Sequence, residues 1–150
     1  MGSMSALVAN KKAYFTYEIT EKLDAGIELF GHEVKSLRAG QGSLEGAFVS
    51  VRGNEAYLIG ATIAPYQVNN ISKEYDPTRA RRLLLQREEI NRLTGLESAK
   101  GAHAVPLEFF LKNNLIKLSI GIGRHKNQHD KRETIKKRET QRELRREMNA

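Results

Sequence analysis

The sequence predicts a mainly β fold with short helices: a small, closed, OB-fold-like β-barrel with flanking helices and a basic C-terminal tail that is disordered when free. Short apolar segments alternate with turn residues through the body, and two pairs of these segments are joined by hairpin-type turns. The tail has few large apolar side chains. The 150 residues suffice for one domain, expected over 9–123, with the tail over 124–150 and a flexible N-terminus over 1–8.

The first half of the body reads as strands around one helix. Alternating apolar positions predict strands over 26–30, 48–52 and 56–61. The last two form a hairpin across Gly53-Asn54, residues that tolerate the positive φ of a tight turn. A short helix is expected over 32–39, with Gly40 placed to end it.

The second half reads as a polar loop, a helical insert and another hairpin. The loop covers 67–76, and helices are predicted from Arg87 to Gly95 and over 96–99. Strands over 107–111 and 115–122 join across a turn containing two asparagines, which visit the left-handed region readily. An Ig-like sandwich is disfavoured because this helical insert is large for that architecture. Among small barrels, the OB-fold fits best.

The tail has the most informative charge pattern. Residues 124–150 contain ten Lys/Arg against five Asp/Glu, and their only large apolar side chains are Ile135, Leu144 and Met148. Such a segment cannot offset its ordering entropy by burying surface of its own. A solvated helix held by Glu–Arg pairs is the alternative. We favour an arm that folds on a polyanion, and RNA is the first partner to consider.

Composition argues against several other classes of function. Without cysteine there is no disulfide, thiol nucleophile or Cys-ligated zinc. The four histidines lack metal-ligand spacing and no catalytic motif stands out, so neither enzymatic activity nor a cofactor or metal is expected. A pI near 9.7 points to nucleic acid. There is no long apolar run or secretory signal, and a cytoplasmic protein is expected. Met1-Gly2-Ser3-Met4 looks like a cloning scar.

Several strings, in order and with near-family spacing, resemble the SmpB family of SsrA-binding proteins. They are Asn10-Lys11-Lys12-Ala13, Ala25-Gly26-Ile27, the Gly-His-Glu-Val-Lys-Ser-Leu-Arg-Ala-Gly string at 31–40, Asp76-Pro77-Thr78-Arg79, Leu83-Leu84-Leu85 and His129-Asp130-Lys131-Arg132. The Glu-Val-Lys-Ser-Leu-Arg-Ala-Gly string at 33–40 and the Asp-Lys-Arg start of the tail are specific to that family. The resemblance covers about residues 9–148.

The resemblance implies an OB-fold protein that binds the tRNA-like domain of transfer-messenger RNA (tmRNA, or SsrA). Such proteins deliver this RNA, aminoacylated and carried by elongation factor Tu, to bacterial ribosomes stalled on truncated messages. Their tail folds as a helix in the empty mRNA channel, next to the decoding region. Translation then switches to the RNA's own reading frame, which tags the incomplete product for degradation. A generic OB-fold binder of single-stranded RNA, or a ribosome-associated protein, is the alternative.

The expected RNA-binding residues fall into two sets. Asn10, Asp24 and Leu84 match positions that the family links with RNA binding, and cationic clusters and aromatic side chains complete the set on the body. That set is Asn10, Lys11, Lys12, Tyr14, Phe15, Asp24, Lys35, Arg79, Arg82 and Leu84. The set on the tail, expected in the decoding region and mRNA channel, is Lys126, His129, Asp130, Lys131, Arg132, Lys136, Arg138, Arg142 and Arg145.

Two segments depart from the family pattern. Tyr14-Phe15-Thr16-Tyr17 stands where an Arg-His-Asp-Tyr-like string is usual, so a cation and an imidazole are lost while aromatic faces remain. His125-Lys126-Asn127 stands in place of Gly-Lys-Lys, with loss of the glycine and one charge. We expect the change at 14–17 to affect the affinity for RNA. We expect the change at 125–127 to affect entry of the tail into the mRNA channel.

Overall fold

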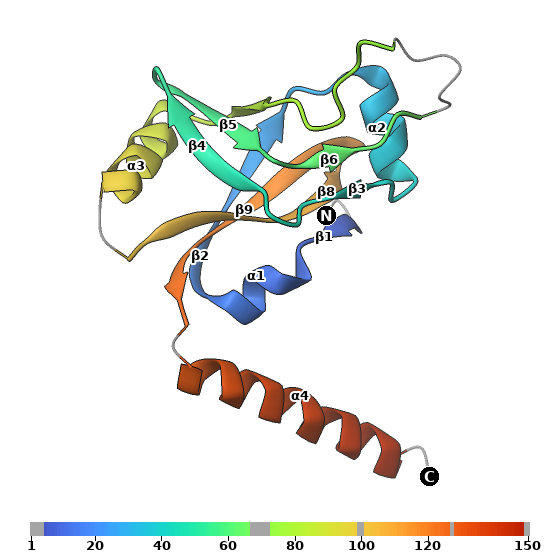
Figure 1. The fold of residues 1–150 in the computed structure, drawn as a ribbon, viewed down its shortest axis with the longest axis vertical. Helices are drawn as coiled ribbons and strands as arrows, with labels where there is room; N and C mark the ends of the chain where they lie inside the picture. Colours follow the sequence, from blue (N-terminus) through green and yellow to red (C-terminus); the bar gives the residue numbers. More distant parts are fainter. Residues whose placement is uncertain (1–4, 67–72, 99–100, 127, 149–150) are drawn as a thin grey trace.

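The computed structural model describes residues 5–66, 73–98, 101–126 and 128–148 (Figure 1). The strands are β1 (Ser5–Ala9), β2 (Tyr17–Ile27), β3 (Gly42–Ser43), β4 (Phe48–Arg52), β5 (Glu55–Ile59), β6 (Thr62–Ile63), β7 (Arg81–Leu84), β8 (His103–Lys112) and β9 (Leu115–His125). The helices are α1 (Lys11–Thr16), α2 (Gly31–Arg38), α3 (Arg87–Ser98) and α4 (Gln128–Met148). The mainly β fold with short helices is confirmed.

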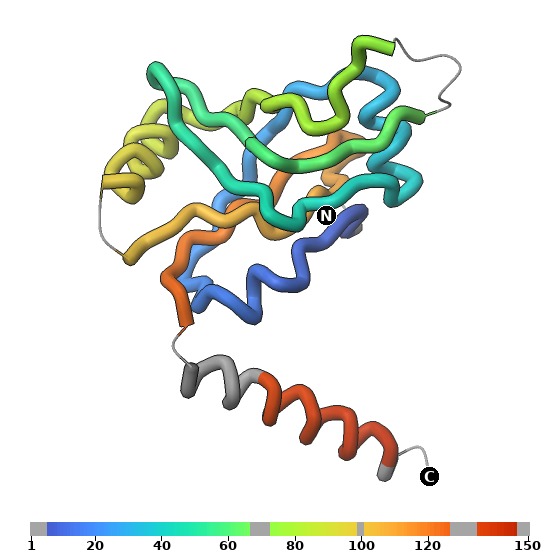
Figure 2. The backbone as a smooth tube through the Cα atoms, in the orientation of Figure 1, coloured from blue at the N-terminus to red at the C-terminus, as the bar shows by residue number. Residues whose placement is uncertain are grey.

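Seven strands form one strongly curled antiparallel sheet in the order β1-β8-β9-β2-β7-β5-β4 (Figure 2). The short strands β3 and β6 pair separately. The hydrogen bonding does not close the predicted barrel: β1 and β4 end the ladder, and among the described residues no strand pairing joins β4 to β8, although the two lie close in space. On the edge of β4 that has no partner strand, the Val51 N–H instead donates a hydrogen bond to the Glu97 carboxylate of α3 at 2.9 Å.

Both predicted hairpins are confirmed, because their turn residues adopt the backbone conformation that the turns require. Gly53 and Asn54 have φ of 54° and 69° between β4 and β5, and Asn113 and Asn114 have φ of 52° and 63° between β8 and β9. Asparagine and glycine occupy this left-handed region at low cost. The helix predicted over 32–39 is also confirmed as α2, and φ is +73° at Gly40 after it.

Other predicted elements are wrong in extent. The strand predicted over 26–30 is the end of β2, which begins at Tyr17, and 28–30 lie outside it. The two predicted helices after Arg87 are one helix, α3, which continues through Gly95 because Leu93 and Leu96 pack on the core on both sides of it. The sequence reading missed α1, β1, β3, β6 and β7. The flexible N-terminus predicted over 1–8 is wrong for residues 5–8, because β1 pairs with β8 there. Of the polar loop predicted over 67–76, residues 67–72 lie outside the described part.

The C-terminal boundary of the body also differs from the prediction. β9 continues past residue 123 and pairs with β2 as far as His125, opposite Tyr17. The next backbone N–H, that of Lys126, donates to the Thr16 carbonyl at 2.9 Å. The body therefore holds the chain to residue 126, and α4 follows from Gln128. α4 projects from the α1 end of the body (Figure 1).

The core lies inside the curl of the sheet. Leu37 of α2, Leu58 of β5, Phe109 of β8 and Ile120 of β9 are all fully buried there. Burial of side chains of this size stabilises a fold by about 1.5–3 kcal/mol each. A smaller cluster of Ala13, Val105 and Leu107 anchors α1 to β8.

Candidate nucleic-acid interface

A buried ionic network joins α2 to the first residue of β7 and to the segment before that strand. The fully buried Glu33 carboxylate accepts hydrogen bonds from Arg81 at 2.8 and 3.0 Å, from the Tyr75 hydroxyl at 2.9 Å and from Arg79. The remaining donors of the buried Arg81 guanidinium reach carbonyl oxygens, including that of Ala61 at 2.9 Å. Every charge in the network is therefore paired.

Electrostatics keeps the acid of this network ionised. Burial alone would raise the pKa of Glu33, but hydrogen bonds from Arg79, the Phe30 N–H and Arg81 outweigh it and lower the pKa to about 2. The Arg79 guanidinium also lies 4.0 Å from the centre of the Phe30 ring. Arg79 and Arg81 thus both bind the Glu33 carboxylate, Arg79 remains partly exposed, and Arg82 is the most exposed of the three arginines.

One continuous face of the sheet brings together predicted RNA-binding residues that are far apart in sequence. Asp24 of β2 and Leu84 of β7 both point outward, and Leu84 pairs with Gly26. A Cβ atom at Gly26 would lie 3.1 Å from the Leu84 Cβ, so the glycine lets this exposed leucine lie flat against β2. Arg82 extends the same face and forms ion pairs with Glu28 and Glu55. We name the outward side of β2 and β7 the β2–β7 face.

Helix α1 borders the β2–β7 face. The exposed Tyr14 ring lies 5.5 Å from Lys22 Nζ of β2, and hydrogen bonding to Tyr14 raises the pKa of Lys22 above its ordinary value. Asn10, just before α1, donates its side-chain amide to the Pro106 carbonyl at 2.9 Å and its backbone N–H to Leu107 at 2.7 Å. Asn10 thereby anchors the helix that presents Tyr14.

The other predicted side chains of the body lie around this region or beyond it. Lys11 is exposed, Lys12 forms an ion pair with Glu45, and Phe15 is half-buried. Lys35 is exposed on α2. The structure thus places Asp24, Arg82 and Leu84 on one face with Tyr14 beside them, whereas Lys35 lies on a separate element.

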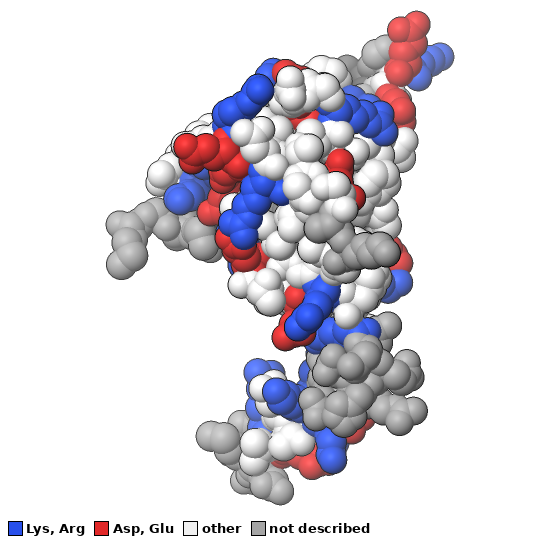
Figure 3. All heavy atoms as spheres, turned by 90° about the vertical axis from the view of Figure 1, so that its left-hand side faces the viewer, with Lys and Arg blue, Asp and Glu red and all other residues white. Residues whose placement is uncertain are grey.

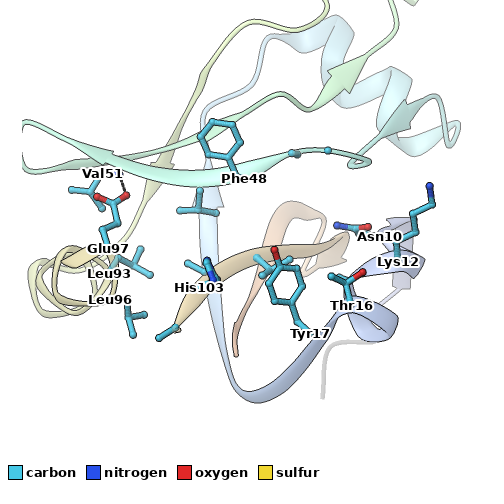
Figure 4. Close-up of a pocket in the computed structure, with 17 residues that line it drawn as sticks. Asn10, Lys12, Thr16, Tyr17, Phe48, Val51, Leu93, Leu96, Glu97 and His103 are labelled. Carbon is cyan, nitrogen blue, oxygen red and sulfur yellow. Dashed lines mark hydrogen bonds between the residues drawn. The ribbon is translucent and has the colours of Figure 1, made fainter. Parts of the chain in front are cut away.

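A cleft of about 550 Å³ lies where β4 and β8 remain unpaired (Figure 4). One wall consists of Asn10, Thr16, Tyr17 and His103, and the facing wall is provided by β4 and includes Val51. Leu93, Leu96 and Glu97 of α3 line one end. The cleft has both polar and apolar lining.

The predicted tail residues are only partly described. Lys136, Arg138, Arg142 and Arg145 are exposed on α4, and Lys126 is half-buried where the body ends. The side chains of His129, Asp130, Lys131 and Arg132 lie outside the described residues. Figure 3 shows Lys and Arg gathered on the described part of α4, whereas the body carries both signs on the side shown.

The sequence reading missed Lys22 and Tyr57 as members of the interface. Lys22 lies two residues before Asp24, and strand alternation places both on one face; recognising β2 from residue 17 onward would have revealed it. Tyr57 of β5 pairs with Arg82 and donates its hydroxyl to Glu55 at 3.0 Å. Tyr57 lies beside Arg82 only because β5 pairs with β7, and no local sequence signal indicates that pairing.

Metal-ligand groups and membrane-spanning helices also bear on the class of protein. Among the described residues, no group of three or more His, Cys, Asp or Glu side chains could hold a metal ion. None of the helices in the described part is long and apolar enough to cross a membrane. A curled β-sheet with exposed cations and aromatic rings, extended by a basic helix, is the organisation typical of a nucleic-acid-binding protein.

Comparison with known proteins makes the assignment specific. The chain belongs to the SmpB family: the family model described as SmpB protein matches residues 7–150. An SsrA-binding protein of Gloeothece citriformis is 44% identical over 147 residues, which cover 98% of this chain and 95% of the relative. The SsrA-binding protein of Synechococcus sp. JA-3-3Ab is 47% identical over 146 residues, which cover 97% of this chain and 95% of the relative. That of Mesoplasma florum is 48% identical over 136 residues, which cover 91% of this chain and 91% of the relative.

A solved structure agrees with this assignment. A chain from the work described as "tmRNA-SmpB: a journey to the center of the bacterial ribosome" matches at a TM-score of 0.67 and 37% identity. The match covers 87% of this chain and 95% of that one. The family expected from the sequence is thereby confirmed.

Proposed function

We propose that this protein binds the tRNA-like domain of transfer-messenger RNA and delivers it to stalled bacterial ribosomes for trans-translation. The observation that supports this most directly is the family match over residues 7–150, which spans both the body and the basic tail. The relatives named above are SsrA-binding proteins. The work that includes the solved chain names tmRNA, SmpB and the bacterial ribosome together.

In this proposal the body binds the folded RNA through the β2–β7 face and α1. Proteins recognise structured RNA by its shape, its phosphates and its unstacked bases. Lys22 and Arg82 supply cations, while Leu84 and Tyr14, 49% and 41% exposed, supply apolar and aromatic surface. Asp24 adds an acceptor for a base amine or a ribose hydroxyl. Lys11, Lys12, Phe15 and Lys35 belong to the same proposed set of contacts.

The tail acts as the sensor of an empty channel. A charged arm that gains its folding free energy only when docked loses that free energy if mRNA already fills the channel. The cations on α4 would contact the channel, and Lys126 with the segment His129, Asp130, Lys131 and Arg132 would lie near the decoding region. Elongation factor Tu is the expected carrier of the aminoacylated RNA, in the cytoplasm, and the curled sheet would correspond to an OB-type barrel.

The test uses a competition and a truncation. The chain is titrated against transfer-messenger RNA in the presence of an equal-length unstructured RNA, and tight binding that resists the competitor is expected. Equal loss to either RNA would support the alternative, a generic single-strand binder. A variant ending after Lys126, which keeps the β2–β9 ladder complete, should bind the RNA like the full chain and fail to support tagging on stalled ribosomes. Tagging by this variant would contradict the role of the tail.

A further inference from the structure

Three rings meet where the body ends and the tail begins. Tyr17 opens β2, His103 opens β8 and His125 closes β9. The ring centroids of Tyr17 and His125 lie 4.4 Å apart, those of His103 and His125 4.9 Å apart, and those of Tyr17 and His103 5.6 Å apart. These distances fall in the range of favourable aromatic contact. We name Tyr17, His103 and His125 the junction cluster.

Backbone contacts hold the same point of the chain. Tyr17 and His125 form the last pair of the β2–β9 ladder, and the Lys126 N–H donates to the Thr16 carbonyl at 2.9 Å. Arg124 Nε lies 3.8 Å from the Glu18 carboxylate across the two strands. α4 begins at Gln128, so only one residue separates it from the last held residue of the body.

The reach of the tail depends on where the body releases it. An extended chain gains about 3.5 Å per residue. If Arg124, His125 and Lys126 came free and Gly123 became the last fixed residue, the start of the tail would gain about 10 Å of extra reach. Slack lowers the effective concentration of a tethered segment at its target, because the tether then samples a larger volume. Fixing residues 124–126 therefore favours entry of the tail at one place.

We propose that Tyr17, His103 and His125 are positioning residues, which hold the end of β9 and so set where and in which direction the tail leaves the body. This inference rests on the proposed function, in which the tail enters the mRNA channel. It also couples two sites, since Thr16, which binds the Lys126 N–H, is the last residue of the helix that presents Tyr14 to RNA. RNA bound at α1 would thus also order the start of the tail.

The test separates RNA binding from the step that needs the tail. Tyr17→Leu removes one ring and keeps an apolar side chain, Tyr17→Phe keeps the ring, and His125→Gly removes the ring on β9. Tyr66→Leu is the matched control, since Tyr66 is another half-buried tyrosine and lies outside both the junction cluster and the β2–β7 face. Each variant is measured for affinity to transfer-messenger RNA and for the rate of tagging on stalled ribosomes.

We expect Tyr17→Leu and His125→Gly to slow tagging about tenfold while RNA affinity stays within about twofold of wild type. Tyr17→Phe should tag like wild type, and Tyr66→Leu should not change the ratio of tagging rate to affinity. Tagging at the wild-type rate by both ring-deleted variants would overturn the proposal. An equal loss of affinity and tagging would also overturn it, because the rings would then be RNA contacts.

A second measurement needs no RNA. Hydrogen exchange at the Lys126 amide should accelerate in Tyr17→Leu and His125→Gly, because its hydrogen bond to Thr16 opens more often, while exchange at Leu118 in the core stays unchanged. Unchanged exchange at Lys126 would refute the proposal. This result stands even if Tyr17→Leu folds poorly, since His125→Gly alters an exposed residue at a strand end. If the wild-type chain neither bound the RNA nor tagged, the proposed function would fail, and exchange would still report on the junction.

Discussion

At the scale of single residues, Glu33 and Arg81 show how a motif that resembles a binding signature can instead hold the fold together. Glu33 lies in the string at 31–40, and Arg81 follows the string at 76–79, two of the strings that carried the family resemblance. The structure joins these strings through one buried carboxylate. A buried ion pair adds little net stability relative to apolar residues, but removing one partner is costly because the other charge remains buried and unpaired.

Glu33→Gln should lower the free energy of unfolding by about 3–5 kcal/mol at pH 7, because it leaves Arg81 buried without its counter-charge. Urea denaturation measures this. Glu55→Gln is the control, and its half-exposed pair with Arg82 should contribute less than about 1 kcal/mol. Similar losses of unfolding free energy in both variants would show that burial of the Glu33 ion pair does not increase the cost of removing one partner.

The same residue predicts a pH dependence with a definite sign. Because folding lowers the pKa of Glu33 from 4.5 to about 2, its contribution is complete above about pH 4.5 and is lost as the pH falls toward 2. The difference in unfolding free energy between wild type and Glu33→Gln should therefore shrink by about 3 kcal/mol over that window. A difference that stayed constant down to pH 2 would contradict the lowered pKa.

At the scale of elements, Gly121 and Gly123 let neighbouring chain segments approach β9 closely where the sheet curls. A Cβ atom at Gly123 would lie 2.1 Å from the Glu18 carbonyl oxygen, and one at Gly121 would lie 2.9 Å from Leu107. The register of β2 shifts between Ile19 and Glu21, opposite this part of β9. Both glycines lie inside a strand, where glycine commonly marks a bend or a close approach of another backbone.

Gly123→Ala should destabilise the fold by at least about 2 kcal/mol, because the methyl group meets backbone atoms that cannot rotate away. Gly95→Ala is the matched control: no atom lies within 4 Å of its added Cβ, and α3 should gain up to about 1 kcal/mol. Thermal unfolding of both variants measures the difference, and a Gly123→Ala protein as stable as wild type would disprove the close approach.

The charge spacing of α4 makes its helix dependent on a partner. Arg138, Arg142 and Arg146 follow each other at four-residue intervals, as do Glu139 and Glu143. Like charges at that spacing destabilise a helix by about 0.2–0.5 kcal/mol per pair. A polyanion on the arginine row would remove the repulsion there. The structure gives the tail as helix α4 without a partner, which differs from the sequence-based prediction of a tail that is disordered when free.

Arg142→Ala should therefore raise the helix content of the free chain. It removes like-charge contacts with Arg138, Arg145 and Arg146 and introduces the best helix former, while only one attraction, to Glu139, is lost. It should also weaken ribosome binding. Circular dichroism, with the spectrum of the chain ending after Lys126 subtracted, measures the first effect, and sedimentation with ribosomes measures the second. Changes of both quantities in the same direction would contradict a tail helix supported by its partner.

At the scale of the whole molecule, the charges are segregated. The body carries both signs, and most of the net +7 belongs to the tail. Body and tail should therefore respond differently to salt, because cations that contact phosphates release condensed counterions when they bind. Cations already paired within the protein, such as Arg92 with Glu21, contribute less to that response.

Affinity for transfer-messenger RNA should fall steeply as salt increases. Lys35→Ala should reduce the slope of log K against log salt by about 1, the value of one phosphate contact. Arg92→Ala is the control and should leave the slope unchanged. Filter binding at four salt concentrations gives both slopes, and a flat response of the wild type would show that the basic clusters do not contact RNA.

The sequence by itself determined the features that depend on local chemistry. Both hairpins, α2 and the polar tail followed from positive-φ turn residues, a glycine stop and charge density, each of which acts over a few neighbouring residues. The family followed in the same way, because it is carried by short strings. Of the candidate site, Asp24, Leu84 and the cations could be named one by one, without any indication of which share a surface.

Only the tertiary structure decided what depends on distant segments. α1 is six residues long and is fixed by packing of Ala13 on β8, and β7 exists because β2 and β5 pair with it on both sides. Strand pairing also created the β2–β7 face, the Glu33 network and the junction cluster. The physical reason is that burial and pairing are long-range: local sequence sets the turn, but which strand lies beside it depends on the whole sheet.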